Sequence, residues 1–328
     1  MWIVRPQCKP ITPPVPTLSV GNLRIGGTGK TPVVQALARY CIEQGIRPAI
    51  LLRGYRRRSR GTVLVSAGEG PCVPWQDAGD EAWLHAWKLP QALVLVDRRR
   101  ERAALAAVAR GAELVLLDDG FQYRRLGRDA DLVVIDPATL RACCCVPFGT
   151  LRQPLRAARR ATLLLLWEEL ADNPLPKELA GLPTVLLRFR SGMPYRLDSA
   201  GGVHPLQQPP DRPVVAFAGI ARPERFRATL LHHGWRLAAW YGLPDHYRYG
   251  PITLWWLLRS CHRYRTPWLA TTEKDAVRLL PLLPRLERAG CVLAVFPLEV
   301  EFCGNPAPLW ELLQRLVEQA RSARKDIA

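Results

Sequence analysis

The stretch that decides the fold is Gly26-Gly27-Thr28-Gly29-Lys30-Thr31, which follows the expected strand 17–20 and precedes an apolar-periodic segment. A nucleotide loop needs backbone N–H groups aimed at anionic oxygens, and glycine lets the backbone come close to those oxygens. It also needs a lysine that reaches the terminal phosphates and a hydroxyl for Mg²⁺, which Lys30 and Thr31 supply. The stretch therefore predicts a phosphate-binding loop between a strand and a helix.

One position departs from the usual spacing of such a loop. The pattern G-x-x-x-x-G-K-[ST] requires glycine at position 24, and the residue there is Arg24. Two interpretations remain: a variant phosphate loop, or a plain glycine-rich turn between strand and helix. The Gly-Lys-Thr sequence after an apolar strand favours the phosphate loop. The residues expected to bind the nucleotide are Arg24, Ile25, Gly26, Gly27, Thr28, Gly29, Lys30 and Thr31.

An acidic pair, Asp118 and Asp119, comes directly after the apolar run 114–117. In phosphate-loop enzymes a carboxylate at such a strand end holds Mg²⁺, either directly or through water. The carboxyl ends of parallel strands meet at the same edge of a sheet. An ordinary Asp-Gly turn is the alternative. Together with the loop, the pair predicts a Mg²⁺ site made of Thr31, Asp118 and Asp119.

The rest of the chain alternates between apolar runs and amphipathic segments. We expect strands at 17–20, 49–52, 92–96, 114–117, 132–135, 163–167 and 184–187, and helices at 30–41, 80–88 and 98–110. This alternation is typical of an α/β fold of the phosphate-loop NTPase type, with a mostly parallel sheet and helices on both faces. We expect this kinase domain at 1–170, a Pro- and Gly-rich linker at 171–212, and a smaller α/β domain at 213–328.

The charge of the chain is strongly positive, with a formal net charge of +17 and a pI near 10.0. Such a surface favours anionic partners: nucleic acid, an anionic membrane or a phosphorylated substrate. A coding bias toward arginine is the alternative, since lysine is rare in this chain. Nucleic-acid binding is not expected, because no recognisable module with interleaved aromatic residues is present. The sequence predicts no obligate protein partner.

The location inside the cell is predicted from cysteines and from hydrophobic runs. The nine cysteines are odd in number and lack CxxC spacing, so we expect free, mostly buried thiols in a reducing compartment. Residues 1–6 lack the apolar core of a signal peptide, and no apolar run is long enough to predict a transmembrane helix. Peripheral attachment to a membrane stays compatible with these features.

The sequence closely resembles one family, tetraacyldisaccharide 4'-kinase, the lipid A 4'-kinase of Gram-negative bacteria. Its motifs run in the family's order: Val20-Gly21-Asn22 with the loop and Pro32, Arg53-Gly54-Tyr55, Ala78-Gly79-Asp80-Glu81, Asp118-Asp119-Gly120-Phe121-Gln122, Leu151-Arg152-Gln153-Pro154-Leu155, Phe217-Ala218-Gly219-Ile220-Ala221-Arg222-Pro223, Pro244-Asp245-His246-Tyr247 and Thr272-Glu273-Lys274-Asp275.

The resemblance implies transfer of the ATP γ-phosphate to the 4'-hydroxyl of a tetraacylated glucosamine disaccharide 1-phosphate, at the cytoplasmic face of the inner membrane. On sequence alone, Asp80 is a helix cap and His246 an ordinary loop histidine. The resemblance instead implies that Asp80, paired with His246, acts on the sugar hydroxyl as the catalytic pair. It also implies that Arg152, Glu81 and Gln122 bind the substrate.

The chain also departs from the family pattern. Tyr123 stands where the family usually has histidine, and residues 146–154 replace the usual Leu-Pro-Ala-Gly-Pro-Leu-Arg-Glu-Pro block. Family members commonly carry an N-terminal membrane helix, which we do not expect here because the segment before Pro14 is short. Residues 255–258 (Trp-Trp-Leu-Leu) offer an alternative membrane contact, although we expect them to pack in the core.

Two other classes of function remain open on sequence grounds. The first is a phosphate-loop ATPase or GTPase that switches a protein partner, which would hydrolyse nucleotide without a lipid acceptor. The second is a basic adaptor for membranes or nucleic acid with a degenerate nucleotide site, whose binding would be salt-sensitive and independent of ATP. Neither class needs the His246 motif.

Overall fold

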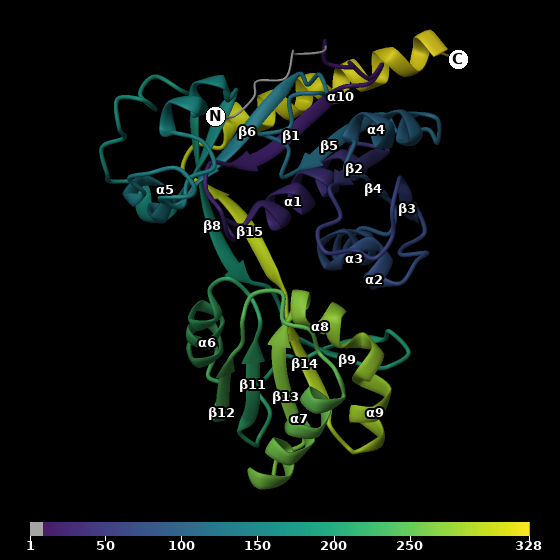
Figure 1. Cartoon of the computed structure of the whole chain (residues 1–328), viewed down its shortest axis with the longest axis vertical. Coiled ribbons are helices and arrows are strands. Elements are labelled where there is room, and N and C mark those ends of the chain that lie inside the picture. The colour runs from purple at the N-terminus through teal and green to yellow at the C-terminus, as the bar shows by residue number, and fades with distance from the viewer. Residues whose placement is uncertain (1–8, 328) are drawn as a thin grey trace. The chain divides into compact units, whose positions relative to one another are not determined.

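The structure is a computed structural model that describes residues 9–327 and divides into two compact units (Figure 1). Unit 1 contains the chain up to Arg188 together with the segment from Val300 onward, and unit 2 contains Phe189–Glu299. Residues 1–8, which bear on the expected absence of a signal peptide, lie outside the described residues. Within residues 9–327, none of the helices combines the length and the apolar character needed to span a bilayer.

Unit 1 is built on a large sheet whose strand order is β15-β8-β7-β6-β1-β5-β2-β4-β3. Its strands are β1 (Thr17–Asn22), β2 (Pro48–Leu52), β3 (Val63–Ala67), β4 (Leu93–Val96), β5 (Leu114–Asp118), β6 (Ala130–Ile135), β7 (Leu163–Trp167), β8 (Thr184–Ser191) and β15 (Leu298–Cys303). From β8 to β4 neighbouring strands are parallel, and β3 pairs antiparallel with β4 at the edge. The central strands are buried throughout, as expected for a sheet covered on both faces.

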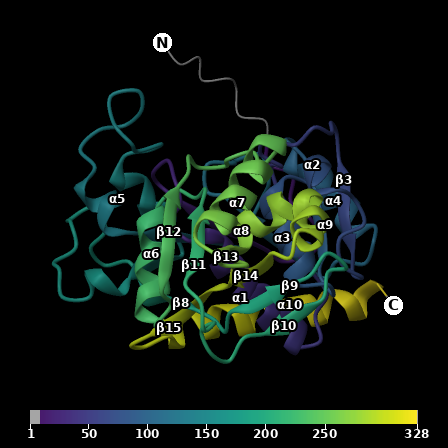
Figure 2. The same ribbon diagram turned by 90° about the horizontal axis from the view of Figure 1, so that it is seen from below.

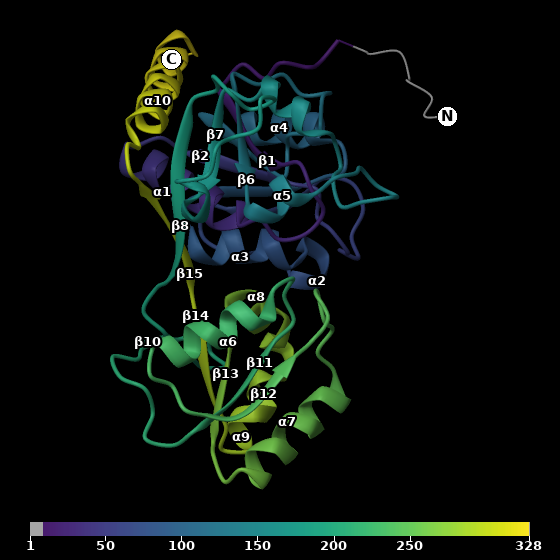
Figure 3. The same ribbon diagram turned by 90° about the vertical axis from the view of Figure 1, so that its left-hand side faces the viewer.

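Helices cover both faces of this sheet. The helical segments of unit 1 are α1 (Lys30–Glu43), α2 (Trp75–Ala78), α3 (Asp80–Lys88), α4 (Arg100–Val108), α5 (Pro137–Arg141), η1 (Leu155–Arg160), η2 (Glu168–Leu170) and α10 (Ala307–Ile327). Leu51 and Leu117 pack with Ala103 of α4 in one buried cluster. On the other face, α1 packs on β1, β2 and β5, and Figure 3 shows α1 and α10 on the same side of the sheet. The Tyr40 ring of α1 lies 5.2 Å from the Trp310 ring of α10. The predicted class, a mostly parallel α/β sheet of the phosphate-loop type, is confirmed.

Unit 2 is a smaller α/β unit with strand order β10-β9-β14-β13-β11-β12. Its strands are β9 (Tyr195–Leu197), β10 (Val203–Pro205), β11 (Val214–Ala218), β12 (Leu237–Gly242), β13 (Trp268–Thr272) and β14 (Val292–Phe296), and its helical segments are α6 (Pro223–His232), α7 (Pro251–Arg263), α8 (Glu273–Leu279), η3 (Leu280–Leu282) and α9 (Leu283–Arg288). Strands β12, β11, β13 and β14 are parallel, and β9 and β10 add antiparallel pairs. Figure 2 and Figure 3 show α6 and α7 on opposite faces of this sheet.

The division of the chain differs from the predicted one at both boundaries. Within the expected linker 171–212, β8 belongs to the large sheet and β9 and β10 to the small one. The C-terminal segment belongs to unit 1, because α10 packs against β5 and the Arg321 guanidinium donates a hydrogen bond of 2.8 Å to the Gln44 carbonyl. A Pro- and Gly-rich composition was the basis for the predicted linker. Composition does not indicate that the C-terminal segment of the chain packs with unit 1.

The cysteines of the described residues are all free thiols, as expected. The expectation that they are mostly buried is wrong. Cys41, Cys261 and Cys291 are buried, whereas the others are exposed or half-buried: Cys72, Cys143, Cys144, Cys145 and Cys303. The Cys143–Cys145 run lies in an irregular segment after α5, where Cys143 and Cys144 are exposed and Cys145 packs half-buried against a core cluster.

Candidate active site

The phosphate loop connects β1 to α1, as the sequence predicts. Gly26 and Gly29 have φ angles of 105° and 85°, which side-chain-bearing residues rarely adopt. Asn22 Nδ2 donates a hydrogen bond of 3.0 Å to Thr28 Oγ1, and Trp167 Nε1 donates one of 3.1 Å to the Thr28 carbonyl. These buried bonds fix the loop at the N-terminus of α1, where the helix dipole favours an anion.

Arg24 supports the loop from outside. Its Nε and Nη2 atoms donate hydrogen bonds of 3.0 and 2.8 Å to the buried carboxylate of Asp136, and Nη1 donates one of 2.8 Å to the Ile25 carbonyl. Asp136 also caps α5 by accepting a hydrogen bond from the Thr139 amide. This bidentate pair explains why position 24 need not be glycine. The predicted contact of Arg24 with nucleotide stays a prediction.

The predicted metal residues lie beside the loop. β1 and β5 are parallel neighbours, with Val20 opposite Asp118. Thr31 Oγ1 lies 3.3 Å from Asp118 Oδ2, and Lys30 Nζ lies 3.3 Å from Asp119 Oδ1. The structure therefore brings the loop and the acidic pair into direct contact.

Asp119 lies between two cations. Arg152 Nη1 donates hydrogen bonds of 2.9 and 2.7 Å to its two carboxylate oxygens, and Lys30 approaches from the loop. Burial acts to raise the pKa of Asp119, but the charges of Lys30 and Arg152 outweigh it and lower that pKa to about 2. Its backbone is left-handed, with a φ of 60°, a conformation that costs about 1–2 kcal/mol for most residues and that aspartate tolerates better. Asp119 is thus a fixed anion.

His85 is a member of the site that the sequence analysis missed. Its Nε2 atom lies 3.0 Å from Asp118 Oδ2, and both side chains are buried. The residue lies on α3, a little more than one turn after Asp80 and Glu81. The sequence did show a histidine on a predicted helix that begins with an acidic pair. The positions of these residues in the sequence do not reveal that His85 contacts Asp118 of β5.

Two buried acceptors near the loop have no hydrogen-bond partner within residues 9–327. They are Asn22 Oδ1 and Gln122 Oε1, and the Gln122 amide nitrogen donates a hydrogen bond of 2.6 Å to the Asn22 carbonyl. Buried polar atoms are normally paired, so these acceptors are suited to a bound ligand. Gln122 is one of the residues predicted to bind substrate.

The residues present fit a magnesium–nucleotide complex. Within the described chain no three His, Cys, Asp or Glu side chains form a preassembled metal cluster. Mg²⁺ at nucleotide sites usually takes one or two protein ligands together with phosphate oxygens and water. A hydroxyl and a carboxylate at the mouth of the loop, from Thr31 and Asp118, meet this requirement.

The two departures from the family pattern also lie in unit 1. Tyr123 hydrogen-bonds to Glu101 through its hydroxyl, and the Arg100 guanidinium lies 4.3 Å from the centre of its ring. Burial and the Glu101 carboxylate raise the pKa of Tyr123 to about 12. The block 146–154 pairs with the phosphate loop, since the Ile25 amide donates a hydrogen bond of 2.8 Å to the Thr150 carbonyl.

The predicted acceptor residues of unit 1, Asp80 and Glu81, occupy the first turn of α3. Asp80 is buried, and its Oδ1 atom accepts a hydrogen bond of 3.0 Å from the Glu81 amide. Glu81 is half-buried. An acidic pair in this position is also stabilised by the helix dipole.

His246 belongs to unit 2, in a loop that a buried network holds in place. The carboxylate of Asp275 accepts hydrogen bonds from the Gly219 amide at 3.1 Å and the Tyr249 hydroxyl at 2.7 Å. Arg278 donates to Asp275, to the Gly219 carbonyl and to the Tyr247 carbonyl. Three motifs named in the sequence thus converge at the carboxyl end of the small sheet. Asp275 and Arg278 position the His246 loop, a role the sequence did not reveal.

Gly219 shows how closely these segments approach. A Cβ atom there would lie 2.9 Å from Tyr247 Cβ and 3.2 Å from the Pro244 carbonyl oxygen. His246 itself has a φ of 57°, and its amide donates a hydrogen bond of 3.1 Å to the Gly219 carbonyl. The backbone of this loop is therefore built around Gly219.

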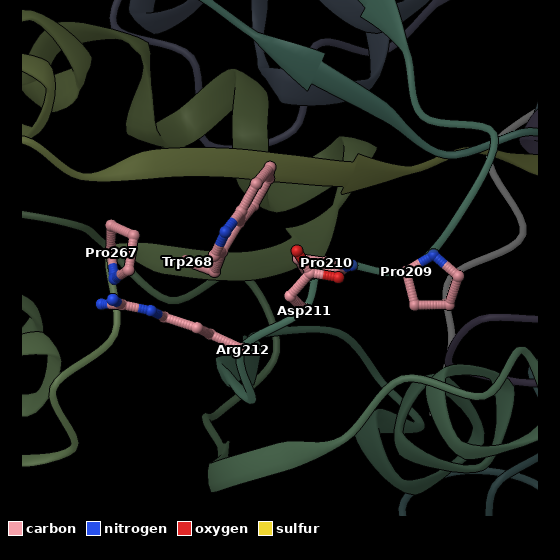
Figure 4. A pocket seen from close by; sticks show the side chains of 6 residues that line it. All are labelled: Pro209, Pro210, Asp211, Arg212, Pro267 and Trp268. Carbon is pink, nitrogen blue, oxygen red and sulfur yellow. The ribbon is translucent and has the colours of Figure 1, made fainter.

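A surface pocket of about 310 Å³ also lies on unit 2 (Figure 4). Its lining comes from residues 209–212 and from Pro267 and Trp268, which lead into β11 and β13. It therefore lies at the amino end of the parallel strands, whereas Asp275 and the His246 loop lie at their carboxyl end. Ligands of open α/β sheets bind at the carboxyl end, so we assign no catalytic role to this pocket.

Comparisons with known proteins agree with this arrangement. The family model described as tetraacyldisaccharide-1-P 4'-kinase matches residues 4–318. Tetraacyldisaccharide 4'-kinase of Pelobacter propionicus is 35% identical, with 93% of this chain and 84% of the relative covered. The enzyme of the same name from Syntrophotalea carbinolica is 41% identical over 81% of this chain and 74% of the relative.

A solved structure is also similar across nearly the whole chain. It is LpxK from Aquifex aeolicus in complex with ATP, which is 31% identical and superposes with a TM-score of 0.76, covering 94% of this chain and 91% of that one. The resemblance seen in the sequence is confirmed by these matches. The chain accordingly belongs to the tetraacyldisaccharide-1-P 4'-kinase family.

Proposed function

We propose that this protein transfers the γ-phosphoryl group of ATP to the 4'-hydroxyl of a tetraacyldisaccharide 1-phosphate, a lipid A precursor. The observation that carries the proposal is the contact between the phosphate loop and the acidic pair, in which Lys30 and Thr31 approach Asp119 and Asp118. Membership of the family and the ATP complex of a relative support the same activity.

At the nucleotide end, the backbone amides of the loop and Lys30 bind the phosphates. Thr31 and Asp118 would hold Mg²⁺, which when bound neutralises charge on the transferring phosphoryl group. Asp119 keeps Lys30 and Arg152 in place beside the loop. Because both cations lie next to the loop, they can also stabilise negative charge that develops during transfer.

At the acceptor end, Asp80 accepts the proton of the 4'-hydroxyl as that oxygen bonds to the γ-phosphorus. The bond between the γ-phosphorus and the bridging oxygen breaks, and ADP leaves. His246 orients Asp80 in this proposal, and Glu81, Gln122 and Arg152 bind the sugar phosphate. In this proposal the two catalytic residues come from different units, Asp80 from unit 1 and His246 from unit 2.

The acyl chains of the acceptor place the reaction at a lipid surface, and we assign the protein to the cytoplasmic side of the inner membrane. Helix α7 supports this location. Ile252 is 83% exposed and Trp255 is 60% exposed at its N-terminal end, and Arg259 and Arg263 follow on the exposed side. Apolar and basic side chains on one exposed helix face suit an anionic bilayer.

The test is a transfer assay with purified protein, ATP, Mg²⁺ and the lipid disaccharide. Lys30→Ala removes the charge on the phosphates and is expected to lower kcat by about 100-fold or more, as loss of one transition-state contact does. Lys177→Ala, on the exposed surface, is the matched control and should leave turnover unchanged.

The outcome also separates the rival classes. Hydrolysis of nucleotide that does not depend on the lipid acceptor would point to a switch ATPase or GTPase. Salt-sensitive membrane binding without any nucleotide turnover would point to an adaptor. Unchanged transfer by Lys30→Ala would disprove the assignment of the phosphate loop.

A further inference from the structure

His85 contacts the proposed metal residue Asp118 but has no role of its own in the proposed chemistry. The His85 side chain is fully buried and Asp118 is 3% exposed, yet Nε2 and Oδ2 lie 3.0 Å apart. An ionised carboxylate can only accept a hydrogen bond, so we assign a ring proton of His85 to Nε2, the nitrogen that faces Asp118. α3 and β5 supply the two residues, which are 33 positions apart in the sequence.

The histidine is costly as a mere packing residue. Its second nitrogen, Nδ1, is buried and has no hydrogen-bond partner within residues 9–327. Leaving such an atom unpaired costs about 1–3 kcal/mol, a cost that leucine would avoid. Because His85 is present despite this energetic cost, we expect it to act through Nε2, the nitrogen that contacts Asp118.

The hydrogen bonds to Asp118 distinguish its two oxygens. Oδ2 accepts from His85 Nε2 and from Thr31 Oγ1, at 3.0 and 3.3 Å. Oδ1 makes no hydrogen bond within the described residues. A carboxylate held through one oxygen presents the other in a fixed direction. Residues that hydrogen-bond to metal ligands commonly orient those ligands in this way.

The same contact anchors α3. Asp80 begins this helix and His85 lies five residues later, so the bond to Asp118 also fixes the segment that carries the proposed acceptor base. The nucleotide side and the acceptor side of unit 1 are thus joined by one buried hydrogen bond.

We propose that His85 is a positioning residue that holds the Asp118 carboxylate with Oδ1 available to Mg²⁺, and so sets the metal affinity of the site. The inference rests on the proposed function only in taking Asp118 as a metal ligand. The role requires no change in the protonation of either residue.

The test compares His85→Leu, which removes the donor, with His85→Gln, whose amide nitrogen can still donate to Asp118. Binding of Mn²⁺ in the presence of a non-hydrolysable ATP analogue is followed by the paramagnetic resonance of the free ion. His85→Leu should weaken binding by roughly 10- to 100-fold, and His85→Gln should recover most of the affinity. His204→Leu, which removes an exposed histidine paired with Asp198, is the matched control and should bind as the parent does.

The opposite results overturn the proposal. A folded His85→Leu with parental Mn²⁺ affinity would do so, and so would His85→Gln if it bound as weakly as His85→Leu. The binding measurement needs no lipid acceptor. Absence of kinase activity would therefore count against the proposed function and leave this test intact.

A measurement on the parent protein remains if His85→Leu does not fold. In protein with ¹⁵N-labelled histidine, the His85 resonances should show the proton on Nε2 and should shift when Mg²⁺ and the ATP analogue are added together. The proposal would be contradicted if the proton were on Nδ1, or if the His85 resonances did not change when the metal and the analogue were added.

Discussion

Adjacent residues with the same side chain have different environments in this site. Asp118 is buried against one histidine and one hydroxyl, whereas Asp119 is 37% exposed and pairs with two cations. Asp118 ends β5, whereas Asp119 follows the strand with a left-handed backbone, at a φ of 60°. The difference favours Asp118 as the proposed metal ligand, whereas Asp119 pairs with Lys30 and Arg152 and its predicted contact with the metal stays a prediction.

The pKa of Asp119 leads to a prediction about stability and pH. Its folded-state value of about 2 lies below the ordinary 3.8, so its ion pairs stabilise the fold above about pH 4 and lose this effect as the pH falls toward 2. Asp119→Asn should therefore lower the free energy of unfolding near neutral pH, and the gap to the parent should close between pH 4 and pH 2. Urea unfolding at several pH values measures the gap.

A surface carboxylate provides the control for this experiment. Asp172 is exposed in an irregular segment of unit 1, and Asp172→Asn should differ little from the parent at any pH. If the gap between Asp119→Asn and the parent stayed constant from pH 7 to pH 2.5, the ion pairs with Lys30 and Arg152 would not be the source of the stabilisation.

At the scale of elements, α7 corrects an expectation drawn from the sequence. Core packing was expected for residues 255–258, and the structure separates them. Leu257 is buried and the Trp256 ring packs 4.1 Å from that of Tyr241, whereas Trp255 is exposed. The 3.6-residue period of the helix places Trp255 beside Ile252 on the outer face.

This outer face gives a prediction about membrane binding. Replacing Ile252 and Trp255 with serine should weaken binding to vesicles that contain anionic lipid by at least about 10-fold, because each apolar side chain contributes about 1.5–3 kcal/mol when buried. Co-sedimentation measures binding. Leu231→Ser, an exposed apolar residue of α6, is the matched control. If Leu231→Ser weakened vesicle binding equally, any exposed apolar residue would serve and α7 would have no special role. If the double variant bound as the parent does, α7 would not be the membrane contact.

The elements that the sequence predicted are those with strong local signals. The buried strands of the large sheet and the helix 80–88 are predicted closely, because continuous apolar runs and helical periodicity mark them. β15 was missed because its residues are half-buried or exposed, without an apolar run. His85 was missed because its role depends on a contact between α3 and β5 that no spacing encodes.

At the scale of the whole molecule, the proposed catalysis depends on both units. Unit 1 holds the nucleotide residues and Asp80, and unit 2 holds His246 on a loop fixed by Asp275 and Arg278. Two chain segments link the units, through β8 and β15. If Asp80 and His246 act as a pair, as proposed, transfer depends on residues from both units.

A double-mutant cycle tests this dependence. Asp80→Asn should lower kcat by about 100-fold or more, and His246→Asn should lower it less, since histidine acts through the aspartate. If the two residues work as a pair, the double variant should be no slower than Asp80→Asn alone, because residues that act as a unit are not additive. His262→Asn, an exposed histidine of unit 2, is the control and should leave kcat unchanged. Losses that multiply in the double variant would mean that Asp80 and His246 contribute separately, and the pairing across the two units would have to be abandoned.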